Sequence, residues 1–350
     1  MRRLTIFLGV MSITLLPRAQ AGWPDTNRTV ATVVFGSCNH QSKSQAFWKP
    51  ILDAQPDLFI FAGDNIYADT YRDDLKRQKY AQLGAEPGYQ RLKSNAVVVA
   101  TWDDHDFGLN DSGGEFPEKV ASQRAFQDFF EIPEDHPART REGVYDAYVF
   151  GPPGRRVQVI LLDTRYHRSP LRRLAVRQPG KGRYRANHSR SATVLGEAQW
   201  KWLEQELKKP AEVRLLVSSI QVVAQDHDWE KWNNFPMERT RLYRLIRETG
   251  AEGLIILSGD RHHGELSRMS GVIGYPLYDL TSSGLNMAHG GEFNDWNRYR
   301  VGGIFADQHI GLVRIDWEAP DPLITLELQD LSGRSALRES IPLNRLRRAK

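Results

Sequence analysis

The sequence contains a single cysteine, Cys38, among its 350 residues. Secreted proteins usually place their cysteines in disulfides, but one cysteine cannot pair within its own chain. The fold therefore does not depend on disulfide bonds, and it must be stabilised by an ordinary core. With 40% hydrophobic and 26% charged residues, the chain is long enough for one large core or two modest domains.

Long apolar runs are also missing. The run from Leu4 to Leu16 is well short of the roughly 20 residues that span a bilayer. It follows Arg2-Arg3 and precedes a small-residue segment at 19–21, which is the layout of a cleavable export signal. We therefore expect residues 1–21 to be removed on export, with a retained anchor as the alternative and with the twin-arginine and ordinary secretory routes both open.

No strong charge and no nucleic-acid pattern is present. The net charge is +4, and no basic stripe is interleaved with aromatic residues, so no nucleic-acid partner is expected. The nine Trp residues include Trp200 and Trp202, whose spacing on a predicted helix favours packing. Internal repeats, low-complexity blocks and linkers are absent as well. The sequence therefore predicts one domain over residues 22–350.

Short apolar runs rich in β-branched residues recur along the chain, and most of them end in polar residues. Strands are predicted at 29–35, 57–62, 96–101, 157–162, 213–217, 253–257, 275–280, 309–316 and 323–329, and helices at 44–54, 196–208 and 237–249. Alternating strands and helices predict a layered α/β architecture, with the last three strands extending or pairing with the sheet. Ligands in such folds bind at the carboxyl ends of strands, so the polar clusters should share one site.

Residues that commonly bind metals gather at these strand ends. They are Cys38; Asp64, Asn65 and Tyr67; Asp103, Asp104, His105 and Asp106; and Asp260, His262 and His263. One such residue would more often be structural, since a strand-end Asp commonly caps the next helix. Four clusters in register instead indicate a metal site, in which the neighbours Asp103, Asp106 and His263 are expected to support the ligands.

The order of these motifs resembles the PhoD-like (alkaline phosphatase D) family of metallophosphoesterases. The motifs are Gly36-Ser37-Cys38, Gly63-Asp64-Asn65-Ile66-Tyr67, Trp102-Asp103-Asp104-His105-Asp106 and Ser258-Gly259-Asp260-Arg261-His262-His263. The resemblance extends from about residue 33 to residue 290. It implies a calcineurin-like fold, in which mixed β-sheets are flanked by helices and the metal site lies at strand carboxyl ends. The wider pattern of calcineurin-like metallophosphoesterases has a His at the strand end where this chain has Ser218 and Ser219.

The resemblance also implies metals and ligands. Ferric iron, Fe(3+), would be bound by Cys38, Asp64, Tyr67 and His262, which suit a Lewis-acidic transition ion. Calcium, Ca(2+), would be bound by the oxygen atoms of Asp64, Asp104, Asp260 and Asn110, with Asp64 as the bridge. Zinc, manganese and magnesium are the alternative metals.

Two such ions imply in-line attack on phosphorus by a metal-held hydroxide. His105 would protonate the leaving oxygen or hydrogen-bond the phosphoryl group, or it would only orient a neighbouring ligand. Arg165 would bind the substrate phosphate, or it would form a buried ion pair with Asp163 or Asp146.

The predicted function is therefore an exported phosphoesterase, periplasmic or secreted and monomeric, acting on phosphate monoesters or diesters. A membrane surface becomes a partner if the substrate is a phospholipid. The loops at 71–87 and 168–190, the second strongly basic, would determine specificity. The alternatives are a non-catalytic phosphate- or metal-binding exported protein, and a structural metal site in an exported adhesin or carbohydrate-binding protein.

Overall fold

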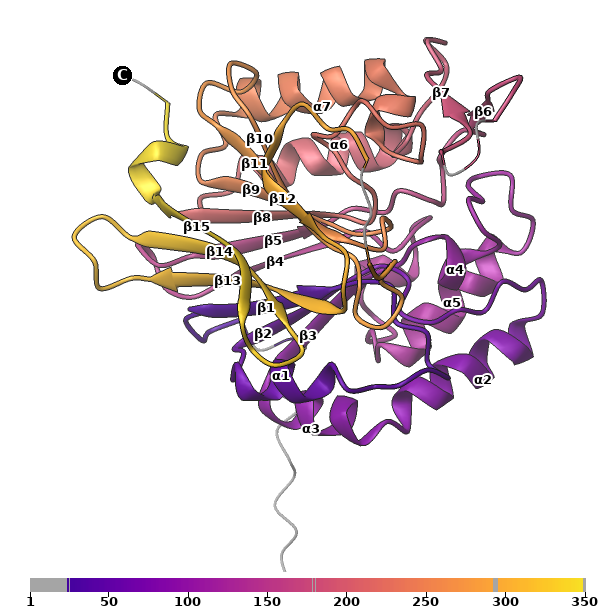
Figure 1. The fold of residues 1–350 in the computed structure, drawn as a ribbon, viewed down its shortest axis with the longest axis horizontal. Coiled ribbons are helices and arrows are strands. Elements are labelled where there is room, and N and C mark those ends of the chain that lie inside the picture. The colour runs from indigo at the N-terminus through magenta and orange to yellow at the C-terminus, as the bar shows by residue number, and fades with distance from the viewer. Residues whose placement is uncertain (1–23, 25, 178, 180, 292–294, 349–350) are drawn as a thin grey trace, which may run out of the picture.

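Two β-sheets face each other, and helices cover both outer faces (Figure 1). The structure is a computed structural model, and it describes residues 24, 26–177, 179, 181–291 and 295–348. The expected export signal at 1–21 lies outside these residues. Among the described residues, none of the helices is both long enough and apolar enough to cross a bilayer.

Each sheet combines parallel and antiparallel strands. The first sheet has the order β15 (Ser335–Pro342), β14 (Leu323–Asp330), β13 (His309–Asp316), β1 (Thr32–Gly36), β2 (Leu58–Ala62) and β3 (Val97–Thr101). The second has the order β12 (Arg300–Phe305), β10 (Gly264–Met269), β11 (Leu277–Ser282), β9 (Leu254–Ser258), β8 (Val213–Ser218), β5 (Val157–Leu161) and β4 (Asp146–Phe150). Strands β6 (Arg172–Arg173) and β7 (Tyr184–Arg185) form a separate small hairpin.

The helices pack on the two outer faces (Figure 1). Helices α1 (Trp48–Asp53), α2 (Asp73–Gly84), α3 (Pro87–Asn95) and α5 (Lys119–Phe129) cover the first sheet, and α6 (Gly196–Leu207) and α7 (Pro236–Thr249) cover the second. The short α4 (Asp104–Phe107) directly follows β3, and 3-10 turns occur at Pro137–Arg139, Trp232–Asn234 and Leu343–Leu346.

The alternation of side chains along β1 and β2 explains this layering. Val33 and Phe35 belong to the core between the sheets, whereas Val34 belongs to the core beneath the helices. On β2, Ile60 faces the first core and Phe61 the second. Successive residues of a strand point to opposite faces, so a strand that is apolar at every position is buried on both sides.

The site is positioned by the parallel strands. Strands β1, β2 and β3 run parallel, as do β5, β8, β9 and β11. Their carboxyl ends meet at one edge, where the Ser37 amide of the first sheet donates to the Ser282 carbonyl of the second over 3.0 Å. The polar segments that follow β1, β2, β3 and β9 therefore converge, as the sequence predicted.

The predicted fold class is confirmed, with strand bounds that differ by up to three residues from those expected. The sequence reasoning missed α2, α3, α4, α5, β4, β6, β7, β10, β12 and β15. Most of these elements are polar or short: α2 reads DDLKRQKYAQLG and β15 reads SALRESIP, with many exposed positions. They form because they pack against an existing sheet or pair with a neighbouring strand, which local periodicity does not report.

Replacement of Phe61 tests the core beneath the helices. Its ring is fully buried, with ring centroids of Trp48, Tyr89 and Phe130 at 6.3, 6.0 and 5.9 Å. Phe61→Ala should lower the free energy of unfolding by about 3–5 kcal/mol, because it leaves a cavity. Urea unfolding would measure this loss, with Val120→Ala at an exposed position of α5 as the control. A loss below about 1 kcal/mol would contradict this packing.

Candidate metal centre

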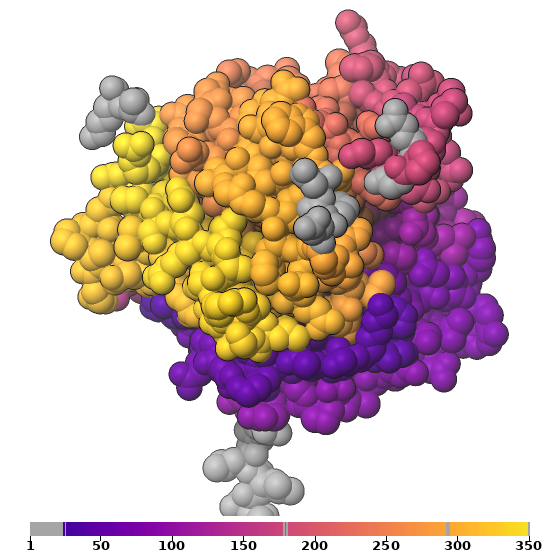
Figure 2. Space-filling model, viewed as in Figure 1, coloured from indigo at the N-terminus to yellow at the C-terminus, as the bar shows by residue number. Residues whose placement is uncertain are grey.

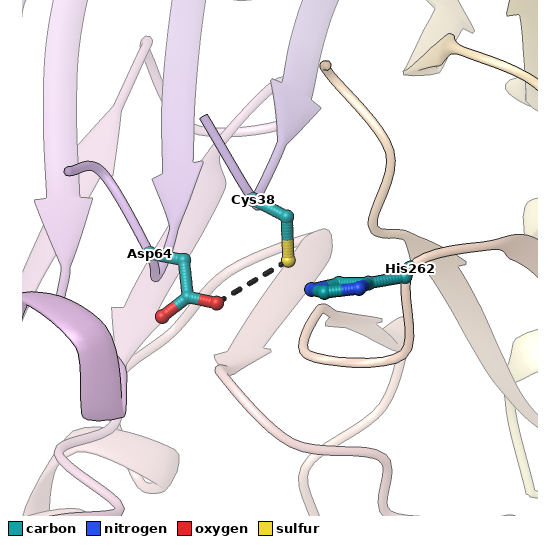
Figure 3. A group of neighbouring side chains, drawn as sticks. All are labelled: Cys38, Asp64 and His262. Atoms are coloured by element: carbon teal, nitrogen blue, oxygen red, sulfur yellow. Dashed lines mark hydrogen bonds between the residues drawn. The ribbon is translucent and has the colours of Figure 1, made fainter. Parts of the chain in front are cut away.

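Four of the expected ligands meet where β1, β2 and β9 end. Donor atoms of Cys38, Asp64 and His262 lie within 4.8 Å of one another (Figure 3). The Cys38 Sγ is 3.4 Å from the Asp64 Oδ2. The Tyr67 hydroxyl lies 3.0 Å from the His262 Nε2 and 3.3 Å from the same Asp64 oxygen. A thiol, a phenol, an imidazole and a carboxylate thus surround one point.

The backbone of these ligands adopts an uncommon conformation. The φ angles of Cys38, Asp64, Asp260 and His262 are 62°, 50°, 69° and 54°, all in the left-handed region. Non-glycine residues seldom occupy this region, and strain of this kind, costing on the order of 1–3 kcal/mol per residue, concentrates at functional sites. At these residues the chain turns instead of continuing the direction of the strand, and the turns bring the four side chains toward one another.

Gly63 permits the close approach of β2 to β3. Its φ is 105°, and a Cβ atom at this position would lie 2.6 Å from the Cβ of Asp103. Any side chain here would push apart the two segments that carry Asp64 and Asp104. Glycine is therefore required both by the backbone conformation and by the contact.

A second group of carboxylates adjoins the first. Donor atoms of Asp103, Asp104 and Asp260 lie within 4.8 Å of one another, as do those of Asp64, Asp104 and His105. Asn110, the remaining expected ligand, is exposed and lines the same pocket. The structure therefore brings all seven expected ligands to one region, and Asp64 and Asp104 connect the groups.

Asp103 lies closer to this group than the sequence indicated. Consecutive residues were expected to point to opposite faces, but β3 ends at Thr101, and Asp103 is the N-cap of α4. The alternation of a strand no longer applies there, so Asp103 and Asp104 both face Asp260. Asp103 was expected only to support the ligands, but its position makes it a candidate ligand itself.

The donor set fits a cation. The Asp103 Oδ2 and the Asp104 Oδ1 are buried and have no hydrogen-bond partner among the described residues. Such orphaned acceptors are rare in folded proteins, because an unpaired buried polar group is costly. Oxygen atoms of closely spaced carboxylates are the ligands that hard divalent cations prefer.

Burial opposes ionisation of the acidic donors, and a bound cation would reverse that effect. Burial raises the pKa of Cys38 to about 11 and raises the pKa values of Asp64, Tyr67 and Asp260 well above their usual range. It lowers the pKa of His262 to about 3, which leaves the imidazole neutral and able to bind a metal. Positive charge at the centre would favour the ionised thiol, phenol and carboxylates.

His105 lies beside the ligands and is held by a residue that the sequence reasoning missed. Its Nδ1 is 2.8 Å from the Asp69 Oδ2, and its ring stacks on Tyr67 with centroids 4.1 Å apart. Burial would lower the pKa of His105, but Asp104, Asp64 and Asp69 outweigh burial and raise it to about 11. Asp69 follows the Asp64–Tyr67 motif by two residues, and this proximity was the available signal.

Arg165 forms a buried ion pair, with partners other than those expected. Its Nε donates to the Asp103 Oδ1 over 2.5 Å, and its Nη1 donates to the Glu230 Oε2 over 2.8 Å. Its Nη2 lies 3.7 Å from the Asp104 Oδ1. Asp163 accepts a hydrogen bond from the backbone amide of Arg165 and does not pair with its guanidinium. Arg165 does not line the pocket. This placement favours the ion-pair alternative over direct contact with a substrate phosphate.

Further side chains hydrogen-bond to the ligands and to the turns that carry them. The Ser283 Oγ lies 3.1 Å from the Cys38 Sγ and accepts from the His262 amide over 2.8 Å. The Ser219 hydroxyl donates to the Asp103 Oδ1 over 2.5 Å, so this segment supports a carboxylate where the wider pattern has a His. Asp106 accepts from the Asp103 amide over 2.7 Å and fixes the turn after β3.

The ligands open onto a pocket of about 120 Å³. Its walls also include residues to which the sequence reasoning gave no role: Asp111, Arg183, Trp229, Glu230 and Arg261. Only Arg183 lies in a loop that was expected to determine specificity. The other four lie outside those loops, and the packing of distant segments brings them to the site.

Comparison with known proteins agrees with this geometry. A family model described as PhoD-like phosphatase matches residues 33–282. Alkaline phosphatase D of Bacillus subtilis (strain 168) is 23% identical in an alignment 280 residues long, which covers 68% of this chain and 47% of that relative. The chain thus spans about half the length of this curated relative.

Two solved structures share the fold. A structure of PhoD matches with a TM-score of 0.65 at 17% identity, covering 89% of this chain and 72% of that one. GAP50, the anchor in the inner membrane complex of Plasmodium, matches with a TM-score of 0.55 at 11% identity, covering 89% of both chains. At these identities the structures show the fold alone. The family model, in contrast, matches well over half of the sequence, and the chain therefore belongs to the PhoD-like phosphatase family.

Proposed function

We propose that this protein is a metal-dependent phosphoesterase that hydrolyses phosphate monoesters, diesters or both. The observation that carries the proposal is the convergence of the ligand groups around Asp64 and Asp104 on one pocket, with His105 in its wall. A purely structural metal site would be closed by its ligands, whereas this site is open to a substrate.

Two kinds of metal would suit the two groups of ligands. Cys38, Asp64, Tyr67 and His262 would hold ferric iron, and Asp64, Asp104 and Asp260, with Asn110 and Asp103, would hold calcium. When bound, such ions supply Lewis acidity that activates water and neutralises charge on the phosphoryl oxygens. Asp64 lies within reach of both groups and would bridge them.

The side chains around the metals have separate tasks. Asp69 holds the Nδ1 of His105, so the other ring nitrogen can donate a proton to the leaving oxygen. Arg165 holds Asp103 and balances part of the negative charge behind the site. Proton donation matters most for a poor leaving group, because an alkoxide departs slowly unless it is protonated.

The localisation, the oligomeric state and the number of domains remain predictions from the sequence. Export to the periplasm or the medium, a monomeric state and a single domain over 22–350 are parts of this proposal that purification of the mature protein would examine. The choice between monoesters and diesters depends on the pocket rim, which includes Arg183 and Trp229.

Asp64→Asn should abolish turnover of soluble phosphate esters and reduce metal content, because it removes the charge of the bridging ligand. Steady-state kinetics and elemental analysis would measure both effects, with the exposed Asp53→Asn as the control. Prolonged treatment of the wild type with a chelator should also remove activity. Full activity after metal removal would refute the proposal, and tight phosphate binding without turnover of any ester would favour a non-catalytic protein.

Cys38→Ser should lose iron but retain calcium, because only the iron group includes the thiol. Elemental analysis of protein purified without chelators would give the iron and calcium content per chain. The conservative change keeps the buried contact with Ser283, so loss of folding is not expected. Zinc or manganese as the bound metals would overturn the assignment of ligands to metals while leaving the phosphoesterase proposal in place.

His105→Gln should lower kcat by about 10²–10⁴-fold for alkyl phosphate esters and much less for p-nitrophenyl esters. The reason is that nitrophenolate leaves as a stable anion, whereas an alkoxide needs a proton. Comparing kcat for the two ester classes separates proton donation from ligand positioning. Equal losses for both classes would contradict the general-acid role and indicate that His105 only orients Asp104.

A further inference from the structure

The positive charge of the chain is concentrated in one segment. Residues 164–196 contain nine Arg and Lys residues and no Asp or Glu, whereas the whole chain has a net charge of only +4. The rest of the chain is therefore net negative. Such an asymmetry indicates a local surface for an anionic partner.

Most of these cations face solvent. Of the Arg and Lys side chains in this segment, only Arg165, Arg168 and Arg183 form ion pairs within the described part of the chain. The exposed ones are Arg172, Arg173, Arg177, Lys181, Arg185 and Arg190, and most of them lie on or near the β6–β7 hairpin. The hairpin projects from the body of the molecule (Figure 1).

The hairpin is attached directly to the wall of the pocket. The Tyr184 amide donates to the Asp228 carbonyl over 2.8 Å, and the Tyr184 hydroxyl donates to the Asp111 Oδ2 over 2.5 Å. The Arg177 guanidinium lies over the Trp229 ring, 5.6 Å from its centroid. Asp111 and Trp229 line the pocket, so the charged surface begins at its rim.

Two exposed apolar side chains lie on segments that flank the same wall. Val176 on the hairpin is 80% exposed, and Trp296 is 68% exposed. The segment of Trp296 is attached to the pocket wall by Asp295, which pairs with the lining residue Arg261 over 2.7 Å. Arg298 of the same segment donates to Asp226 over 2.8 Å, three residues before Trp229 of the wall. Figure 2 shows both segments on the same face of the molecule.

We propose that the β6–β7 hairpin and Trp296 form a docking surface for a bilayer that contains anionic phospholipid. Clustered Arg and Lys side chains are attracted to anionic headgroups, and exposed aromatic and aliphatic side chains enter the interface. Single exposed apolar residues are ordinary on protein surfaces, but these two flank one pocket beside a cluster of unpaired cations. A soluble polyanion would satisfy the charges without burying Val176 and Trp296, so the bilayer is the better fit.

Vesicle sedimentation tests the electrostatic part of the proposal. The full mature protein should bind phosphatidylcholine vesicles containing phosphatidylglycerol more strongly than phosphatidylcholine alone, and rising salt should weaken this binding. A triple variant should lower the coefficient for partition onto these vesicles about 100-fold, since each cation near an anionic surface strengthens binding about fivefold. This variant combines Arg172→Gln, Arg173→Gln and Arg185→Gln.

A matched control makes the same change of charge elsewhere. Arg338→Gln, Arg345→Gln and Arg347→Gln alter exposed side chains on β15 and the turn that follows it, away from the hairpin (Figure 1). This variant should bind vesicles within about threefold of the wild type, because these cations lie outside the docking surface. Equal weakening by both variants would overturn the proposal, because attraction would then follow net charge alone.

The apolar part needs its own variants. Val176→Ser with Trp296→Ser should reduce the binding that survives high salt, whereas Val120→Ser on α5 should not. Unchanged binding of the Val176 and Trp296 variant, together with stronger binding to soluble polyphosphate than to vesicles, would assign the surface to a soluble polyanion and overturn the bilayer proposal.

Turnover of a soluble phosphate ester distinguishes this proposal from the proposed function. The docking variants should keep the wild-type kcat for such an ester, because they change no ligand and no pocket residue. Loss of vesicle binding with retained turnover supports the docking surface. Vesicle binding by a protein without turnover would leave the docking surface in place and count against the phosphoesterase.

Discussion

The accumulation of buried negative charge around Asp64 and Asp104 is the constraint on which the rest of the site depends. The carboxylates of Asp64, Asp103 and Asp104 are buried and that of Asp260 is partly buried, and donor atoms of Asp104 lie within 4.8 Å of Asp64 on one side and of Asp103 and Asp260 on the other. Burial opposes the charged form of such groups, and their mutual repulsion adds to that cost. The arrangement is therefore stable in its ionised form only if positive charge is supplied.

Part of that charge comes from the protein itself. Arg165 pairs with Asp103 and Glu230, and Arg168 pairs with the other Glu230 oxygen at 3.0 Å. These groups form a buried ion-pair network beside the ligands, and Glu230 of this network also lines the pocket. The Asp103 and Asp104 oxygens that remain without hydrogen-bond partners among the described residues are the ones that metal ions would satisfy. Arg165 and Arg168 thus balance part of the negative charge, and bound metal ions would balance the rest.

The pocket wall also carries cations. Arg183 and Arg261 line it, paired with Asp111 and Asp295, and the exposed cations of the hairpin lie beyond Arg183. An anionic substrate would therefore meet positive charge before it reached the carboxylates. The carboxylates themselves would repel a phosphate, so phosphate binding at this site would require bound metal ions.

The sequence alone determined the layered fold class, the order of the motifs and the kinds of ligand that each strand end carries. Strands such as β2 and β9 were visible because apolar residues fill every position, and Cys38, Asp64, Asp104 and His262 stood out because polar residues follow such strands. These signals lie within short segments, so they can be recognised without knowing which other segments contact them.

Only the tertiary structure decided which atoms face one another. The contact of His105 with Asp69 spans 36 residues, that of Arg165 with Glu230 spans 65, and that of Cys38 with Ser283 spans 245. The turn after β3, which sends Asp103 and Asp104 toward the same carboxylate, arises because a helix starts there. The position of the basic hairpin at the pocket rim likewise depends on its contacts with Asp111 and Asp228. Periodicity and composition describe single segments, whereas these pairings depend on how two sheets pack together.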